Sequence, residues 1–199
     1  MTENKWDTQF QTHTHTYGKE PNYFIRENSN TFPTGAKIAC LAEGEGRNAV
    51  HLATLGYDVT AYDLSSVGLK NAQKLAEENG VTIQTVQADL TKELTVDNPY
   101  DGAIMVFAHV HKEKQQALFD NLFQIVKPGG HILFEVYSEA QLPYASGGPG
   151  KEAFLYDPRD VLTWIASYEC LHFYYGEAER YEGYRHTGLG HVIQAKIRK

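Results

Sequence analysis

The chain has 199 residues, of which 42% are hydrophobic and 22% are charged, as expected for a single globular domain with a sizeable core. Its formal net charge is −7 and its basic residues form no cluster along the sequence, which argues against a nucleic-acid partner. No apolar run approaches the roughly 20 residues of a membrane span, and Cys40 and Cys170 have no metal-ligand or disulfide spacing. We therefore expect a cytoplasmic protein, monomeric or homodimeric, without a membrane, nucleic-acid or metal partner.

The first 34 residues are dense in aromatic side chains. Trp6 and Phe10 lie one helical turn apart, as on the apolar face of a helix. A turn then leads into a second short helix with Pro21 near its start. We expect this segment to pack on the main body of the protein as a cap or lid.

The most informative stretch lies between residues 37 and 49. An apolar run from Ile38 to Ala42 predicts a buried strand, Gly44 and Gly46 predict a tight turn, and the residues that follow predict a helix. A strand, a glycine turn and a helix in this order present backbone N–H groups to a nucleotide-like ligand in many α/β folds. Glycine is needed there because a β-carbon would strain the turn and hold the ligand away from the backbone.

Further along the chain, apolar runs alternate with amphipathic stretches. Helices are predicted to begin after Ser65 and Asp157, which are good N-cap residues, and to cover residues 112–126. Leu162 is expected among the inward-facing residues of the last helix. Strands are predicted over residues 57–63, 81–86, 103–108, 132–136, 171–175 and 191–197.

This alternation predicts an α/β fold with a Rossmann-like, seven-stranded, mostly parallel sheet that has helices on both faces. Residues 127–130 should form a tight turn before the fifth strand, and the last two strands should form an antiparallel hairpin joined by a polar connection. We expect one domain over residues 1–199. It would comprise a cap at 1–34, a cofactor-binding core at 35–137, and a final helix and hairpin at 138–199.

The glycine turn by itself leaves the cofactor open. Gly44-x-Gly46-x-x-Ala49 fits a dinucleotide fingerprint, and Asp63 follows where an acid that binds ribose belongs, so NAD, FAD and S-adenosylmethionine all remain candidates. Two features favour S-adenosylmethionine. Asp89 ends the third strand, where it can accept a hydrogen bond from an adenine amine, and the chain beyond the fifth strand is too short for the substrate domain that most nicotinamide dehydrogenases carry.

Residues 37 to 137 resemble the class I S-adenosylmethionine-dependent methyltransferases. Leu41-Ala-Glu-Gly-Glu-Gly-Arg-Asn-Ala49 is most similar to the small bacterial branch related to tellurite-resistance methyltransferases. Trp6-Asp7-x-x-Phe10 and Tyr17-Gly18-x-x-Pro21-Asn22 are similar to the start of that branch and, more loosely, to thiopurine and thiol methyltransferases. The resemblance implies the seven-stranded fold, S-adenosylmethionine as cofactor, and a soft nucleophile such as a thiol or a metalloid oxyanion as substrate.

The chain departs from the usual pattern of that family, acid-x-Gly-x-Gly-x-Gly, at two positions. Cys40 replaces the strand acid and Ala42 replaces the first glycine. Glu43 and Glu45 lie between the pattern positions and either contact the ammonium group of the cofactor or face solvent. Arg47 either pairs with the cofactor carboxylate or lies on the helix surface.

The expected site has a cofactor side and an acceptor side. Asp63 is expected to bind the ribose hydroxyls and Asp89 the adenine. His109 and His186 are the candidate catalytic residues, because a neutral imidazole can position a nucleophile or take its proton. The expected substrate or lid residues are Tyr17, Tyr137 and Tyr144. The full cofactor-binding set is Glu43, Gly44, Gly46, Arg47, Asn48, Asp63, Leu64, Ala88, Asp89, Leu90 and Phe107.

Methyl transfer from S-adenosylmethionine to a small-molecule nucleophile is therefore the function that the sequence favours. A catalytically idle protein that binds S-adenosylmethionine or S-adenosylhomocysteine is the main alternative, and the replacements at Cys40 and Ala42 keep it open. An NAD-dependent oxidoreductase is a weaker alternative.

Overall fold

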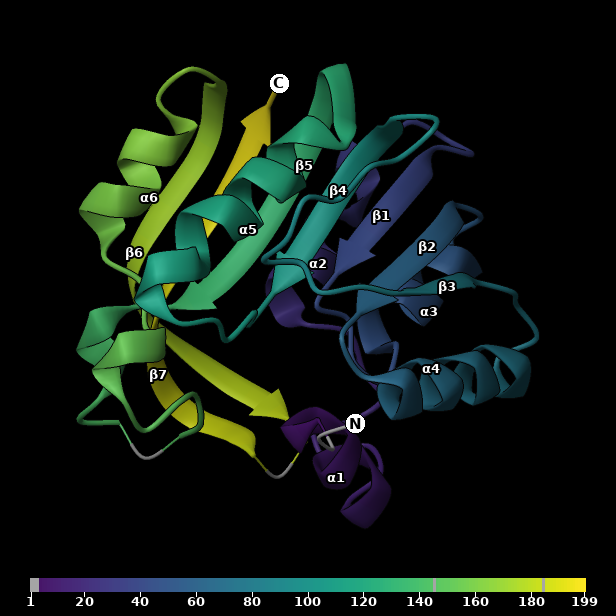
Figure 1. The fold of residues 1–199 in the computed structure, drawn as a ribbon, viewed down its shortest axis with the longest axis horizontal. Helices are drawn as coiled ribbons and strands as arrows, with labels where there is room; N and C mark the ends of the chain where they lie inside the picture. The colour runs from purple at the N-terminus through teal and green to yellow at the C-terminus, as the bar shows by residue number, and fades with distance from the viewer. Residues whose placement is uncertain (1–3, 145, 184) are drawn as a thin grey trace.

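A computed structural model describes residues 4–144, 146–183 and 185–199, so the first three residues of the expected cap, and residues 145 and 184, lie outside the described residues. Seven strands form one sheet in the order β3-β2-β1-β4-β5-β7-β6 (Figure 1). β7 is antiparallel to both of its neighbours, β5 and β6, and the other neighbouring strands pair in parallel. The strands are β1 Lys37–Leu41, β2 Asp58–Asp63, β3 Gln84–Gln87, β4 Tyr100–Val106, β5 Val126–Tyr137, β6 Glu169–Glu182 and β7 His186–Arg198.

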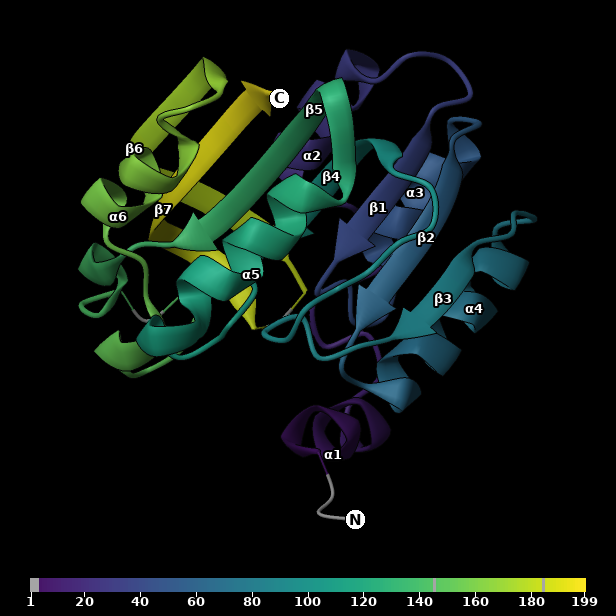
Figure 2. The same ribbon diagram turned by 45° about the horizontal axis from the view of Figure 1, so that its top comes forward.

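Helices cover both faces of the sheet, which confirms the predicted fold class (Figure 2). Helices α5 and α6 pack on one face, and α2, α3 and α4 pack on the other. Helix α1 lies apart from both layers, near the ends of the strands (Figure 1). The helices are α1 Lys5–Thr12, α2 Tyr23–Asn28, α3 Arg47–Thr54, α4 Ser66–Glu78, α5 Lys112–Gln124 and α6 Pro158–Ile165, with short 3₁₀ turns at Ser29–Thr31, Glu139–Gln141 and Glu152–Phe154.

The central strands carry continuous apolar runs because both of their faces are buried. In β1, Ala39 and Leu41 face the core under α5 and α6, whereas Ile38 and Cys40 face the core under α2 and α3. All four side chains are at most 1% exposed. This two-sided burial explains why the sequence shows continuous apolar runs in place of an alternating pattern.

The predicted helix starts are confirmed. Ser65 caps α4 by accepting a hydrogen bond from the Gly68 N–H at 3.0 Å, and Asp157 caps α6 by accepting one from the Arg159 N–H at 2.8 Å. The prediction that Leu162 faces inward was wrong. Its side chain is 44% exposed, because it lies on the outer side of α6.

Two predicted turns are strand instead. Residues 127–130 belong to β5, which begins at Val126 opposite Tyr100 and passes through a register shift before regular pairing resumes. The expected polar connection between the last two strands is also wrong, because backbone pairing continues from Gly176–Val192 to Glu182–His186. The long β6–β7 hairpin therefore reaches the end of the sheet where α1 lies (Figure 1).

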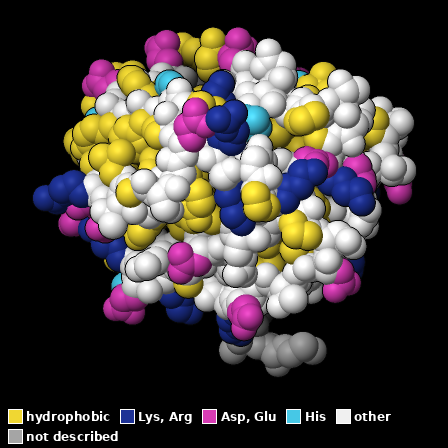
Figure 3. Space-filling model, turned by 90° about the horizontal axis from the view of Figure 1, so that it is seen from above, with side chains coloured by type: hydrophobic (Ala, Val, Ile, Leu, Met, Phe, Trp, Pro, Cys, Tyr) yellow, Lys and Arg dark blue, Asp and Glu magenta, His cyan; other side chains and the backbone are white. Residues whose placement is uncertain are grey.

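Seen from above, the surface carries interspersed charged side chains of both signs, and hydrophobic side chains gather on the side where α6 and β6 lie (Figure 3). No helix in the described part of the chain is long and apolar enough to cross a membrane. Within the same residues, no group of three or more His, Cys, Asp or Glu side chains is arranged to hold a metal ion.

Candidate functional site

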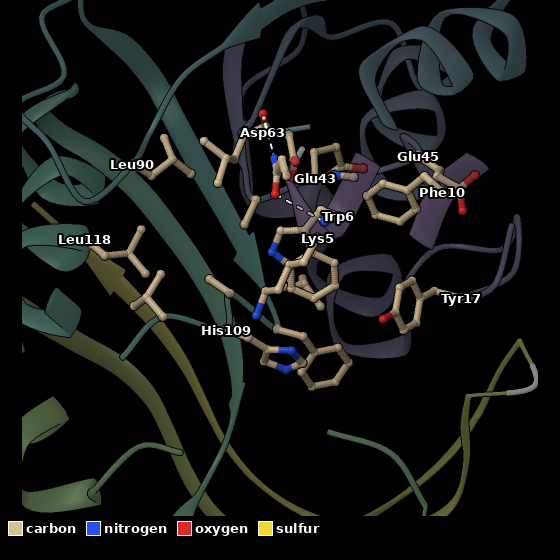
Figure 4. A pocket seen from close by; sticks show the side chains of 18 of the residues that line it. Lys5, Trp6, Phe10, Tyr17, Glu43, Glu45, Asp63, Leu90, His109 and Leu118 are labelled. Atoms are coloured by element: carbon tan, nitrogen blue, oxygen red, sulfur yellow. Dashed lines mark hydrogen bonds between the residues drawn. The ribbon is translucent and has the colours of Figure 1, made fainter. Parts of the chain in front are cut away.

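A cavity of about 380 Å³ lies at the carboxyl ends of β1, β2 and β4, beneath α1 (Figure 4). Ligand pockets of small-molecule proteins fall in this size range, and open α/β sheets bind ligands at this edge. Of the predicted site residues, Gly46, Tyr137 and Tyr144 do not line the cavity. Those that do are Tyr17, Glu43, Gly44, Arg47, Asn48, Asp63, Leu64, Ala88, Asp89, Leu90, Phe107, His109 and His186.

The glycine turn has the left-handed backbone that its sequence predicts. Gly44 has φ 60° and Gly46 has φ 88°. A β-carbon on Gly46 would lie 2.5 Å from the Ala72 β-carbon, so this glycine is required by the packing of α3 on α4. Ala42, at φ 54°, also adopts the left-handed conformation, which costs an L-residue about 1–2 kcal/mol.

Both acids of the turn are buried, so neither faces solvent. Oε1 of Glu43 accepts hydrogen bonds from the N–H groups of Asn48 and Ala49, each at 2.8 Å, and so caps the first turn of α3. Burial raises the pKa of the Glu43 carboxyl to about 7. Oε1 of Glu45 accepts a hydrogen bond from Asn71 at 2.9 Å, while its buried Oε2 has no hydrogen-bond partner among the described residues.

Asp63 joins the glycine turn to the next helix. Its Oδ2 accepts a hydrogen bond from the Gly44 N–H at 2.8 Å, and its Oδ1 accepts one from the Ser65 N–H at 2.7 Å. Burial raises the pKa of this carboxyl. Asp89 lies at the rim of the cavity, where its Oδ1 accepts from the Thr91 hydroxyl at 2.7 Å and its Oδ2 is 3.4 Å from the Lys92 ammonium.

Aromatic and imidazole rings surround the opposite end of the cavity. His186 lies 4.5 Å from Tyr17 and 4.8 Å from Phe107 between ring centroids, and His109 lies 6.1 Å from Trp6. His109 Nε2 and His186 Nδ1 are both buried, and neither has a hydrogen-bond partner within the described part of the chain. Burial lowers the pKa of His109 to about 4 and also lowers the pKa of His186, so both rings are neutral near pH 7.

Two of the three predicted substrate or lid tyrosines lie outside the cavity lining. Tyr137 is buried behind Phe107, with its ring stacked on that of Phe107 at 4.3 Å. Tyr144 lies at the surface beside β6, where its hydroxyl donates to Oε1 of Glu177 at 2.6 Å. Only Tyr17 lines the cavity, and its hydroxyl accepts a hydrogen bond from Gln9 at 2.7 Å.

A buried ionic network lies beneath the imidazole end and was not predicted. Oε1 of Glu135 in β5 accepts hydrogen bonds from Arg180 at 2.6 Å and from Asn22 at 3.0 Å. Asn22 also donates to Glu182, which forms an ion pair with Arg47 at the start of α3. One sequence signal did exist, because Glu135 is a single acid inside the apolar run of β5. Its partner Arg180, and Glu182, which shares Asn22 with it, lie in the connection that was expected between the last two strands.

Comparison with known proteins identifies the domain. The methyltransferase domain family matches residues 38–130. The ubiquinone biosynthesis O-methyltransferase of Rickettsia canadensis is 33% identical over 127 residues, which cover 63% of this chain and 53% of that protein. TehB of Haemophilus influenzae, a probable S-adenosyl-L-methionine-dependent methyltransferase, is 26% identical over 130 residues, or 59% of this chain and 45% of TehB. The chain therefore spans about half the length of these curated relatives.

Solved structures share the fold over nearly the whole chain. The crystal structure of TehB from Haemophilus influenzae has a TM-score of 0.76 and 18% identity, covering 98% of this chain and 67% of that one. N-methyltransferase NodS from Bradyrhizobium japonicum, in complex with S-adenosyl-L-homocysteine, has a TM-score of 0.70 and 12% identity, covering 98% and 99%. With the glycine turn, these findings agree with the resemblance to S-adenosylmethionine-dependent methyltransferases: residues 38–130 match a methyltransferase domain, and the chain is similar to TehB in sequence and in fold.

Proposed function

We propose that the protein transfers the methyl group of S-adenosylmethionine to a small-molecule nucleophile, either a thiol or a metalloid oxyanion. The observation that supports this most strongly is the composition of the cavity. Carboxylates line the end at the glycine turn, and two neutral imidazoles with unpartnered nitrogens line the other end.

The residues at the glycine turn fit the cofactor. Each oxygen of Asp63 accepts one backbone N–H and keeps a lone pair for a ribose hydroxyl. Asp89 at the rim would accept from the adenine amine, with Leu64 and Leu90 against the base. The cationic ammonium and sulfonium groups would favour the charged form of Glu43, whose pKa is about 7, and Oε2 of Glu45 offers a further carboxyl oxygen.

When bound, S-adenosylmethionine supplies an electrophilic methyl group on a sulfonium. The chain's own contribution is to align the nucleophile and to exclude water, since in-line displacement depends chiefly on orientation. Trp6, Tyr17 and Phe107 provide aromatic faces, which attract cations and keep the site dry. His109 Nε2 and His186 Nδ1 each accept a hydrogen bond from the nucleophile or hold its proton.

The test uses the purified full chain with methyl-labelled S-adenosylmethionine and a panel of thiols, amines, selenite and tellurite. Label transfer to a thiol or an oxyanion is the expected result. Cofactor binding by calorimetry, without transfer to any acceptor, would favour the idle binding protein instead. Thermal stabilisation by NAD and not by S-adenosylmethionine would favour an oxidoreductase.

A further inference from the structure

Charge is separated along the cavity. Four carboxyl groups line it: those of Glu43 and Glu45 in the glycine turn, of Asp63 at the end of β2, and of Asp89 after β3. The cations that line it are Arg47, which is paired with Glu182, and Lys5 and Lys114, which come from α1 and α5. Figure 4 shows Asp63 and Glu43 at one end and His109 at the other, with Lys5 and Trp6 between them. Of residues 109–114, which form the start of α5 and the loop before it, those that line the cavity include no acid.

The two lysines differ from their neighbours in having no acidic partner among the described residues. Lys112, on the same helix as Lys114, lies 4.0 Å from Glu139 and 3.7 Å from Glu152. Lys92 is paired with Asp89 at the rim. In contrast, neither Lys5 nor Lys114 has a carboxylate oxygen within 4.0 Å in the part of the chain that the structure describes.

Lys5 is also held over apolar surface. Its ammonium nitrogen lies 4.9 Å from the centroid of the Trp6 ring and 5.2 Å from that of Phe154. Its positive charge adds to burial in lowering the pKa of His109. A cation beside low-dielectric walls exerts a stronger field than the same cation in water.

We infer that the methyl acceptor is a small organic acid, with its nucleophilic atom at His109 and His186 and its carboxylate between Lys5 and Lys114. This inference rests on the proposed methyl transfer and adds the charge of the acceptor to it. The two lysines are specificity-determining residues under this arrangement. They attract an anion, give a neutral acceptor no advantage, and repel a cationic amine.

The test compares 3-mercaptopropionate with 3-mercaptopropionamide, which carry the same thiol on the same two-carbon chain. The acid is expected to have the higher kcat/KM, and its KM should rise with ionic strength while that of the amide stays constant. Lys114→Glu should raise the KM for the acid about fivefold, and adding Lys5→Gln should raise it further, because an exposed ion pair contributes about a fivefold effect at most. Lys74→Glu, an exposed site on α4 outside the cavity, makes the same charge change as Lys114→Glu and should leave both KM values unchanged.

A second readout does not depend on turnover. Titration of 3-mercaptopropionate into protein saturated with S-adenosylhomocysteine should show binding that Lys114→Glu weakens and Lys74→Glu does not. Equal or better use of the amide would overturn the organic-acid inference and leave methyl transfer standing, as would transfer to selenite or tellurite but to neither thiol. Absence of transfer to every acceptor would overturn the inference together with the proposed function.

Discussion

The two ends of the cavity are built in different ways. The carboxylate end is assembled from short sequence distances, since Glu43 bonds to Asn48 and Ala49, five and six residues away, and Asp63 bonds to Gly44 and Ser65. The imidazole end depends on partners far apart in the chain, because Asn22 donates to Glu135 and to Glu182 across 113 and 160 residues. One end can therefore form from the continuous segment between β1 and the start of α4, whereas the other needs the completed sheet.

The largest effect on stability is expected from a substitution in the buried ionic network at the imidazole end of the cavity. Glu135→Ala leaves Arg180 buried without its partner, and we expect the free energy of unfolding to fall by about 3–5 kcal/mol in urea titrations. Glu169→Ala breaks an exposed ion pair with Arg198 on the same hairpin and should cost less than about 1 kcal/mol. Equal losses of unfolding free energy in the two variants would show that the buried Glu135–Arg180 pair stabilises the fold no more than the exposed Glu169–Arg198 pair does.

A smaller effect is expected at the reacting atoms. His109→Ala should lower kcat about 100-fold, the lower limit for a lost proton acceptor, with the dissociation constant of S-adenosylmethionine within about twofold in calorimetry. His172→Ala, an exposed histidine of β6 outside the cavity, is the matched control. Unchanged turnover in His109→Ala would remove this residue from the site.

The same imidazole sets the pH dependence. Its pKa is lowered to about 4 from the ordinary value near 6.5, so the folded protein binds fewer protons than the unfolded chain between these values. The stability contribution of His109 should be full above pH 6.5 and decline as the pH falls towards 4, whereas the ring stays neutral in the folded protein, and activity is kept, until the pH approaches 4. A fall in kcat centred near pH 6.5 would contradict the burial of this ring.

At the carboxylate end of the cavity, the expected effect is a loss of cofactor affinity of about tenfold. Asp63→Ala should weaken binding of S-adenosylmethionine by at least about tenfold, as the loss of charge-assisted hydrogen bonds to the ribose would. Asp58→Ala, an exposed acid at the opposite end of β2, should leave the affinity unchanged. Calorimetry measures both, and equal affinity in the two variants would exclude Asp63 from the cofactor site.

The smallest effect is expected for Tyr144. Its hydroxyl is engaged by Glu177 outside the cavity, so Tyr144→Phe should change kcat/KM by less than about twofold, since surface substitutions away from a site rarely have larger effects. Steady-state assays at two acceptor concentrations are sufficient. A tenfold loss would return Tyr144 to the lid role that the sequence suggested.

Sequence patterns predicted the carboxylate end of the cavity well, for a physical reason. The spacing from Gly44 to Asp63 is set by one helix and one strand, and Ser65 caps the next helix through a bond three residues away. The same patterns could not place Arg180 and Glu182, because polar residues in a tyrosine-rich stretch are typical of a loop. Their burial depends on Glu135 and Asn22, which only the finished sheet brings to them.

The contact between Gly18 and Gly183 has a consequence for the breadth of acceptors. A β-carbon on Gly183 would lie 2.4 Å from the Gly18 nitrogen, so the N-terminal segment and the hairpin tip touch backbone to backbone beside Tyr17 and His186. A β-carbon at either glycine would push these two segments apart and widen the cavity beside Tyr17 and His186. We therefore expect relatives with a larger residue at either of these glycine positions to accept bulkier methyl acceptors, with the cofactor-binding residues unchanged.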